Sequence, residues 1–293
     1  MNSTQKSLFD THTHLNFDDP LFDLGVETSD NEDRVKSFID NAHKAGVTHM
    51  LVPGTNLETS KKAIDIAHND SNIYAAVGIH PADVLEEDGS KREEHIQALH
   101  NLAVSSEKVV AIGEAGLDSY WIFKKIGGDP SQKEARAAAQ AVQKSYFTAQ
   151  WHVAKTLQKA MIIHCRQAKK PLLKLLSEVW DDSFRNRVVF HCCEPDQDLL
   201  DFARGHDIFI GVDGDVTYDT AKQDFIRTVP LNRLVLETDA PFLMPEPVRQ
   251  EKKFPNEPAN VIHVAHMVAN LHSCTFEEVQ EATFSNSKTL FRV

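Results

Sequence analysis

The chain has 293 residues, 41% of them hydrophobic and 25% charged, and a formal net charge of −12. This length fits one large α/β barrel or two small domains. The net negative charge argues against broad electrostatic binding to nucleic acids, although bound cations or a local basic patch can still attract phosphate. No apolar run reaches the length of about 18 residues that a membrane helix needs, and no secretory signal is recognisable. Four cysteines without a CxxC pair do not form a disulfide framework, so we expect a cytoplasmic protein.

Eight short runs rich in Val, Ile and Leu are spaced along the chain. Several of them are apolar without alternation, which is typical of strands buried on both faces of a parallel sheet. The predicted strands are Leu8–Asp10, Thr48–Val52, Tyr74–Gly78, Val109–Gly113, Met161–His164, Val188–His191, Ile208–Val212 and Leu234–Glu237.

Helical patterns lie between most of these runs. The predicted helices are Glu32–Ala45, Glu58–His68, Lys91–Val104, Gln132–Lys159, Lys170–Val179, Asp196–Arg204, Asp219–Thr228, Asn260–Leu271 and Phe276–Leu290. Strands that alternate with helices indicate βαβ units and a parallel sheet. Eight such units predict a single α/β domain over residues 1–293 with the TIM (β/α)8 barrel fold, and an open doubly wound sheet is the alternative.

Residues able to bind metal ions stand at the carboxyl ends of five predicted strands. In a barrel these ends meet at one face, so side chains far apart in the sequence come together. A lone buried histidine is more often a core residue than a metal ligand. Packing requirements alone, however, rarely place a ligand-type residue at the end of five different strands. The predicted metal ligands are His12, His14, Glu114, His164, His191 and Asp239. The neighbours Cys165 and Cys192 should point to the opposite face and pack in the barrel wall.

The spacing of His12 and His14 favours a chelate, because alternate side chains of an extended strand point the same way. Glu114 has two carboxylate oxygens and is able to bridge two cations. Asp239 adds an oxygen ligand and a proton acceptor. Such a mixed set of imidazoles and carboxylates suits Zn, Mn, Fe or Mg rather than a metal that prefers thiolates.

The blocks around these residues resemble a known family, the TatD-type metal-dependent deoxyribonucleases. The resemblance runs through nearly the whole chain, and the order and spacing of the blocks make it more specific than any single motif. The blocks are FDTHTHL (Phe9–Leu15), PGTN (Pro53–Asn56), AVGIHP (Ala76–Pro81), VVAIGEAGLD (Val109–Asp118), IIHCRQA (Ile162–Ala168), FHC (Phe190–Cys192), ETDAPFL (Glu237–Leu243) and NEPAN (Asn256–Asn260).

The resemblance implies a TIM barrel that holds two divalent ions (Mg, Mn or Zn) and cleaves phosphodiester bonds in DNA, often as a 3′ exonuclease. It assigns one ion to His12, His14, Glu114 and Asp239. It assigns the second ion to Glu114, His164 and His191, so that Glu114 bridges the two. His80 corresponds to the histidine of the family that contacts the substrate phosphate.

Three segments of the chain depart from the family pattern. The segment after the sixth strand reads HCCEPDQD from His191, and the seventh strand continues as GVDGDVTYD, which adds Asp213 and Asp215. After the fourth strand, GLDSYWIFKKIGGDP has the character of an inserted loop with an aromatic and basic tip. Added acid at the mouth weakens contact with a polyanion unless it recruits a further cation.

Roles follow from the chemistry that each group offers. Asp239 and Glu114 are the predicted catalytic carboxylates, with Asp239 orienting or deprotonating the attacking water. Glu237 and Asp10 are predicted to orient a ligand imidazole, although a strand-end cap is an equal alternative for Asp10. His80 and Arg166 are the predicted phosphate-binding groups.

Further candidates are less specific. Lys124, Lys125 and Arg249 are cations that could reach a phosphate, and the lysine pair is more often a solvated loop tip. Tyr120, Trp121 and Phe123 are able to stack on unpaired bases or to pack the loop onto the barrel, and packing is favoured for Phe123.

The leading hypothesis is a metal-dependent phosphodiesterase that acts on DNA ends or another phosphodiester substrate. Metal-dependent hydrolysis of an amide, lactone or ester in a small molecule is the alternative, because the same chemistry attacks a carbonyl and a fold does not fix function. Glu114 stands where many barrel amidohydrolases carry a modified lysine, which favours the nuclease-like group. A third hypothesis is a TatD-like subunit that works within a larger multi-protein complex.

Overall fold

Each predicted apolar run forms a strand in the computed structural model, which describes residues 7–17, 31–86 and 89–293. The strands pair in parallel and in chain order from β1 to β8. They are β1 (Leu8–Asp10), β2 (Val47–Pro53), β3 (Ile73–Val77), β4 (Val109–Asp118), β5 (Ala160–Arg166), β6 (Val188–Phe190), β7 (Phe209–Val212) and β8 (Leu234–Leu236).

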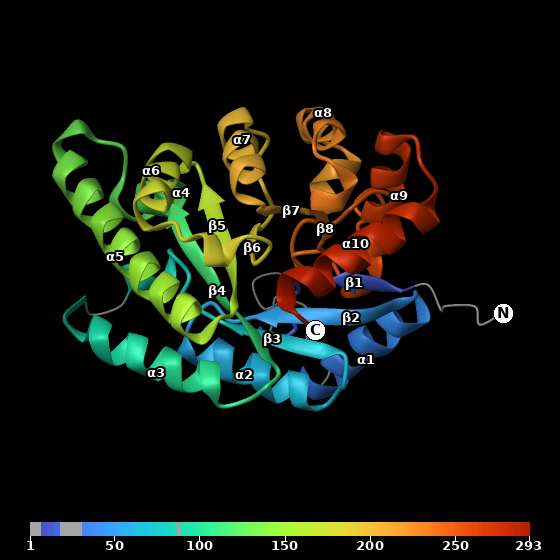
Figure 1. The fold of residues 1–293 in the computed structure, drawn as a ribbon, viewed down its shortest axis with the longest axis horizontal. Coiled ribbons are helices and arrows are strands. Elements are labelled where there is room, and N and C mark those ends of the chain that lie inside the picture. Colours follow the sequence, from blue (N-terminus) through green and yellow to red (C-terminus); the bar gives the residue numbers. More distant parts are fainter. Residues whose placement is uncertain (1–6, 18–30, 87–88) are drawn as a thin grey trace.

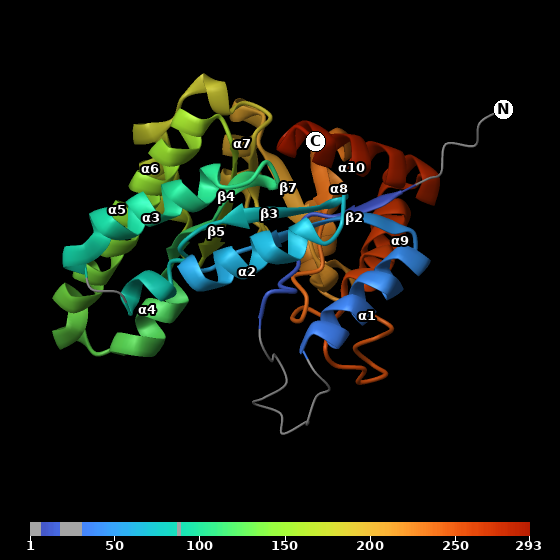
Figure 2. The same cartoon turned by 90° about the horizontal axis from the view of Figure 1, so that it is seen from below.

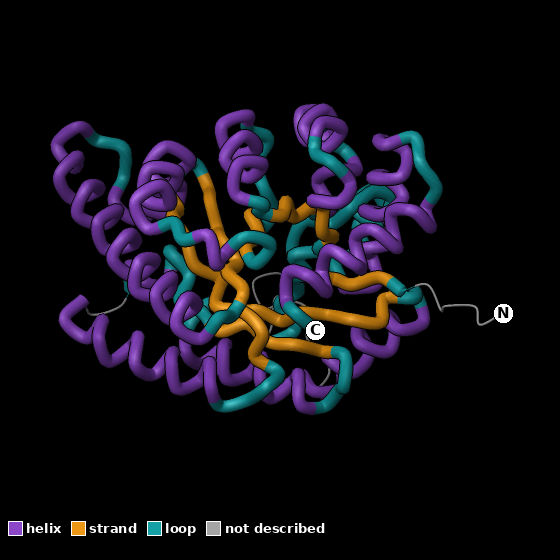
Figure 3. The backbone as a smooth tube through the Cα atoms, in the orientation of Figure 1, coloured by secondary structure: helices purple, strands orange, loops and turns teal. Residues whose placement is uncertain are grey.

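The segments that continue β1 and β8 join the two edges of the sheet. The backbone amide of Thr11 donates to the carbonyl of Leu236 at 2.9 Å, and Thr13 forms a parallel bridge with Ala240. Sequential strand order and this contact confirm the predicted barrel and exclude the doubly wound sheet, in which strand order reverses. Figures 1 and 3 show the strands at the centre and the helices outside them.

The helices occupy the positions expected of a barrel of this type. They are α1 (Asn31–Lys44), α2 (Leu57–His68), α3 (Arg92–Val104), α4 (Ser119–Ile126), α5 (Lys133–Leu157), α6 (Lys169–Val179), α7 (Gln197–His206), α8 (Thr220–Thr228), α9 (Val261–His272) and α10 (Phe276–Phe291). Figure 2 shows α2, α3 and α5 beside one another on one side, and α1, α9 and α10 on the other. Within the described residues, no helix has the length and apolar character needed to cross a membrane.

The segment after the predicted fourth strand is not a loop. β4 continues past Gly113 as far as Asp118, and α4 follows directly. The Asp118 side chain caps this helix by accepting a hydrogen bond from the Trp121 amide at 2.8 Å. Tyr120, Trp121 and the two lysines therefore lie on a helix at the carboxyl end of β4.

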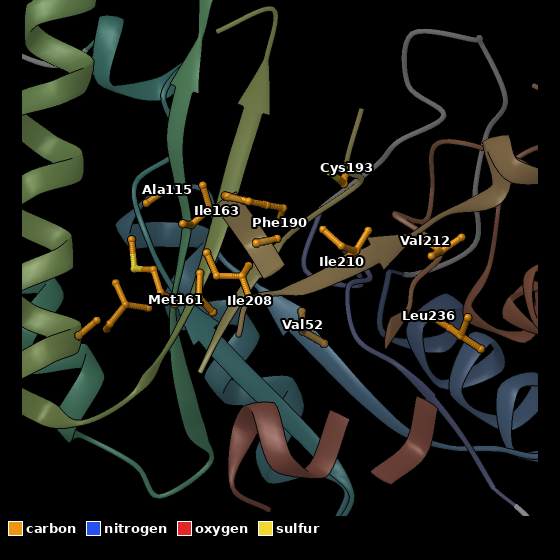
Figure 4. Close-up of a cluster of buried hydrophobic side chains, with 14 of the residues drawn as sticks. Val52, Ala115, Met161, Ile163, Phe190, Cys193, Ile208, Ile210, Val212 and Leu236 are labelled. Carbon is orange, nitrogen blue, oxygen red and sulfur yellow. The ribbon is translucent and has the colours of Figure 1, made fainter. Parts of the chain in front are cut away.

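Alternation along the strands divides the core into two layers. One cluster takes a residue from every strand, including Phe9, Ile162 and Val235, together with Leu290 and Phe291 of α10. The other cluster takes the alternate strand residues, such as Met161 and Ile163, and packs them against the surrounding helices, as Figure 4 shows in part. Because neighbouring strand residues face opposite sides, the first cluster is the barrel interior, and the end of α10 covers its floor.

Candidate metal centre

The inward-facing positions continue toward the carboxyl ends of the strands. His164 lies two residues beyond Ile162 of the inner layer, and His191 lies two residues beyond Val189. Glu237 lies two residues beyond Val235 in the same way. The alternation that fills the lower barrel with apolar groups therefore places these polar groups directly above them.

Four of the predicted ligands converge on one point. The His12 and His14 Nε2 atoms are 3.2 Å apart and lie 3.4 and 3.7 Å from Glu114 Oε2. Asp239 Oδ1 lies 3.7 Å from His12 Nε2 and 3.4 Å from His14 Nε2. Donors arranged tetrahedrally about 2.1 Å from one ion are roughly 3.4 Å from each other, so these spacings fit a divalent metal ion.

The second oxygen of Glu114 faces a different set of imidazoles. Glu114 Oε1 lies 2.7 Å from His164 Nδ1, 3.5 Å from His191 Nε2 and 3.7 Å from His80 Nε2. Each carboxylate oxygen thus has different nearest nitrogen donors, although His191 also approaches the first set, with its ring stacked on His12 and its Nε2 3.8 Å from Asp239 Oδ1. This arrangement allows one carboxylate to serve two cations.

Burial and charge also suit a cation at this position. His12 is fully buried and His14 nearly so, and the Nε2 atom of each ring faces the carboxylates of the other candidate ligands. Burial disfavours the charged form of Glu114, but the charges of His191 and His80 and the hydrogen bonds from His12 and His164 together outweigh that effect, so the pKa of the carboxyl lies well below its usual range. The centre therefore holds an ionised carboxylate among imidazoles, which is the donor set of Zn, Mn or Mg sites.

Asp118 belongs to this site although the sequence did not single it out. Its Oδ2 lies 3.0 Å from His164 Nε2, so both ring nitrogens of His164 face carboxylates. Burial lowers the pKa of His164, but the hydrogen bonds that its ring donates to Asp118 and Glu114, together with the charges of these carboxylates, outweigh it and raise the pKa to about 9. Glu114, Gly116 and Asp118 alternate along β4, and this spacing is the signal that could have identified Asp118.

Glu237 and Asp10 hold different parts of the centre. Glu237 Oε2 lies 3.3 Å from His191 Nδ1 as an ion pair without hydrogen-bond geometry, and its other oxygen accepts from the Cys192 amide. Asp10 accepts hydrogen bonds from the amides of His12 and Thr238 at 3.3 and 3.0 Å. Glu237 is thus placed to orient an imidazole, whereas the bonds of Asp10 match the alternative of a strand-end cap.

A cavity of about 730 Å³ opens over these residues. Its walls include the predicted phosphate-binding groups His80 and Arg166. The Arg166 guanidinium lies 3.9 Å from the centre of the Tyr120 ring, so this cation is held by stacking at the cavity wall. His80 Nδ1 accepts from the Ala82 amide at 3.0 Å, which leaves Nε2 directed toward Glu114.

The other proposed phosphate ligands do not line the cavity within the described residues. The Lys125 ammonium is paired with Glu86. Arg249 bonds Glu246 at 3.0 Å and lies over the Tyr218 ring. Lys124 lies 5.6 Å from the Tyr120 ring centre, on the helix but outside the cavity wall.

The three aromatic residues of α4 have different surroundings. Trp121 lines the cavity and is 37% exposed. Tyr120 supports Arg166, and Phe123 lies outside the cavity wall with the Arg136 guanidinium 5.1 Å from its ring centre. Of the three, Trp121 is therefore the ring that a bound molecule would meet.

The acidic segments of the sequence lie at the cavity wall, but some of their charge is engaged there. The buried Lys222 ammonium bonds Asp213 at 2.5 Å and neutralises it. Asp219 caps α8 by accepting from two backbone amides, and Asp215 accepts from the Tyr218 hydroxyl. Glu194 also lines the wall and accepts from the backbone of the β5–α6 connection.

Of the two cysteines predicted to pack in the barrel wall, Cys165 does pack against the outer hydrophobic cluster, whereas Cys192 is not among the described residues of that cluster. Cys165 and Cys192 both line the cavity. Cys192 has φ of 42°, a left-handed backbone that breaks the alternation on which the prediction rested. Burial raises the pKa of Cys165 to about 12 and also raises that of Cys192, so both are neutral thiols at neutral pH.

Comparison with known proteins connects this geometry to one family. The family model described as TatD related DNase matches residues 9–292. An uncharacterized metal-dependent hydrolase, YabD of Bacillus subtilis, is 32% identical over 288 residues, which cover 98% of this chain and 99% of that protein. A protein of Escherichia coli named 3′-5′ ssDNA/RNA exonuclease TatD is 31% identical over 280 residues, with coverage of 93% and 99%. The crystal structure of the TatD homolog YjjV from Escherichia coli superposes with a TM-score of 0.78 at 28% identity, covering 98% of each chain.

Proposed function

The chain belongs to the TatD related DNase family of metal-dependent hydrolases, and on that premise we propose that it is a two-metal phosphodiesterase that removes nucleotides from DNA ends. One observation carries this proposal. Glu114 Oε2 lies 3.4 Å from His12 Nε2 and Glu114 Oε1 lies 2.7 Å from His164 Nδ1, so each oxygen has a different imidazole beside it, as a carboxylate shared by two divalent ions requires.

The ions in this proposal are Mg, Mn or Zn. His12, His14 and Asp239 would hold one ion, His164 and His191 the other, and Glu114 both. When bound, such a pair lowers the pKa of water and neutralises charge on the attacking and leaving oxygens of a phosphodiester. His80 and Arg166 line the cavity, and in this proposal the His80 Nε2 and the Arg166 guanidinium would bind the phosphate.

Asp239 is the proton acceptor in this scheme. Burial raises its pKa, but a hydrogen bond from His14 and the charge of His191 outweigh that effect, so the carboxylate is ionised at neutral pH. Glu237 orients the His191 ring through Nδ1. The cytoplasmic location stays a prediction, because it rests on the composition of the chain.

The direct test is incubation of the purified protein with labelled single-stranded and double-stranded DNA in Mg²⁺ or Mn²⁺. We expect release of mononucleotides that disappears in Glu114→Ala and Asp239→Ala. Glu178→Ala, an exposed carboxylate on α6, removes the same charge outside the cavity and should retain full activity.

The same assay separates the alternatives. Intact DNA together with metal-dependent turnover of a small ester, lactone or amide would refute the nuclease proposal and support the small-molecule hydrolase. Activity on DNA that depends on co-purifying proteins would support the subunit hypothesis. A protein that binds no divalent ion in equilibrium dialysis would refute both enzymatic hypotheses.

A further inference from the structure

Two large aromatic side chains are exposed inside the candidate active-site cavity. Trp121 is 37% exposed and Phe242 is 45% exposed. Among the exposed large hydrophobic residues of the described chain, these two line the cavity and the others do not. An exposed aromatic ring lacks the stabilisation that burial gives. Two such rings in one cavity therefore indicate a ligand with flat faces that cover them when it binds.

The fold places the two rings on opposite sides of the metal centre. Trp121 follows β4 directly, whereas Phe242 follows β8. Because strand order is sequential and the sheet closes, three strands separate β4 from β8 in either direction. The candidate ligands lie between these two sides.

Each aromatic residue lies three positions after a carboxylate residue of the candidate site. Trp121 comes three residues after Asp118, and its amide donates to that carboxylate at 2.8 Å. Phe242 comes three residues after Asp239, and its amide donates to the Asp239 carbonyl at 2.9 Å. Movement of either ring relative to the candidate metal ligands is therefore restrained through the backbone.

Neighbouring side chains contact both aromatic residues. The Phe242 ring lies 6.2 Å from Phe17, which stacks on His14 at 4.4 Å. The Asn256 amide, which is fully buried, donates to the Phe242 carbonyl at 2.7 Å. Trp121 meets Tyr120 edge to face at 5.7 Å, on the side where Tyr120 carries Arg166.

We propose that Trp121 and Phe242 bind two unpaired nucleobases on either side of the phosphate that is cleaved, and thereby select single-stranded ends. The proposal rests on the nuclease activity proposed above. Aromatic stacking holds bases without regard to sequence, because every base has a flat face. Bases in a duplex are already stacked and paired, so a duplex end must open before the rings reach it.

The test compares Trp121→Ala and Phe242→Ala on a single-stranded DNA decamer and on the same decamer with abasic residues at its last two positions. On the normal strand we expect each variant to raise KM about 5- to 150-fold with little change in kcat, since one stacked base is lost. On the abasic strand, KM of the wild type should already be raised, and the two variants should raise it no further. Phe254→Ala removes a ring of similar exposure from the loop that carries Phe242, outside the cavity, and should behave as wild type.

Binding without added metal provides a second measurement. The decamer should quench tryptophan fluorescence of the wild type, and Trp121→Phe should bind with similar affinity but lose most of the quenching. Equal losses on normal and abasic strands in the alanine variants would overturn the proposal, because the rings would then support the structure alone. A wild-type protein that cleaves neither strand while hydrolysing a small ester would instead refute the nuclease activity itself.

Discussion

At the scale of single residues, the proposed metal centre requires side chains that fix the orientation of the imidazoles. Glu237 is buried and lies 3.3 Å from His191 Nδ1, which leaves Nε2 free to face Glu114. In Glu237→Gln, one carbonyl oxygen still accepts from the Cys192 amide, but the charge beside the ring is lost. We expect metal affinity and kcat/KM to fall about 10- to 100-fold, measured by calorimetric titration and steady-state kinetics. Unchanged affinity would show that His191 needs no partner on Nδ1.

The protonation of two histidines makes the stability of the metal-free protein depend on pH. Burial lowers the pKa of an imidazole, but carboxylates outweigh it and raise the pKa to about 9 for His164 and to about 10 for His191. Both values exceed the ordinary 6.5, so the stabilisation is complete below that pH and is lost as the pH rises through about 9 and 10. Thermal unfolding in EDTA should therefore give a falling midpoint between about pH 7 and pH 10.

A matched variant checks this pH dependence. His164→Gln should flatten the profile, because one of the two groups is gone. The opposite trend is expected for metal affinity, which should rise with pH over the same window since ions displace protons from the imidazoles. A metal-free protein whose midpoint rises toward pH 10 would contradict the assigned protonation.

The sequence predicted which metal-ligand residues come together better than it predicted the residues around them. All six predicted ligands come together because strand ends meet at one face of a barrel. Asp118 was missed because it lies in a stretch rich in glycine and polar residues, where no apolar run marks the strand. Cys192 was misplaced because a left-handed backbone conformation is not visible in the residue types around it.

At the scale of elements, the extension of β4 past Gly113 is the feature that the sequence did not predict. Apolar runs marked most strand boundaries to within a few residues, whereas the last part of β4 pairs with β5 from Ala115 to Asp118 without such a run. This pairing is tertiary in origin, because β5 supplies the partner. It also explains why α4 begins directly at Ser119 and was mistaken for a loop.

Gly116 tests the importance of this extension. A Cβ atom at Gly116 would come 1.8 Å from the His164 carbonyl oxygen, a backbone atom that cannot move without separating β4 from β5. We expect Gly116→Ala to lower the free energy of unfolding by about 3 kcal/mol or more, measured by urea denaturation. Gly205→Ala is the control, because a Cβ there meets open space in α7 and should add about 0.5–1 kcal/mol. Equal stability of the two variants would mean that the strands separate without cost.

At the scale of the whole molecule, the barrel converts distant segments into one centre. Ligand candidates at the ends of β1, β4, β5, β6 and β8 form groups whose ligand atoms lie within 4.8 Å of one another, and the interior beneath them is filled by the apolar layer that α10 covers. A cation bound there would connect segments from both halves of the chain. Metal binding is therefore linked to the stability of the complete fold, in addition to its role in hydrolysis.

This linkage predicts how metal removal acts. An ion supplied at 100 times its dissociation constant adds about 2.7 kcal/mol, which corresponds to roughly 5–10 °C in the unfolding midpoint of a domain of this size. EDTA should lower the midpoint by that amount, and Mn²⁺ or Zn²⁺ should restore it. Elemental analysis should find two ions per chain in the wild type, one in Asp239→Asn, and fewer than one in Glu114→Gln, because Glu114 offers one oxygen to each of the two proposed ions. Equal loss of metal in Asp239→Asn and Glu114→Gln would indicate a single shared site instead of two.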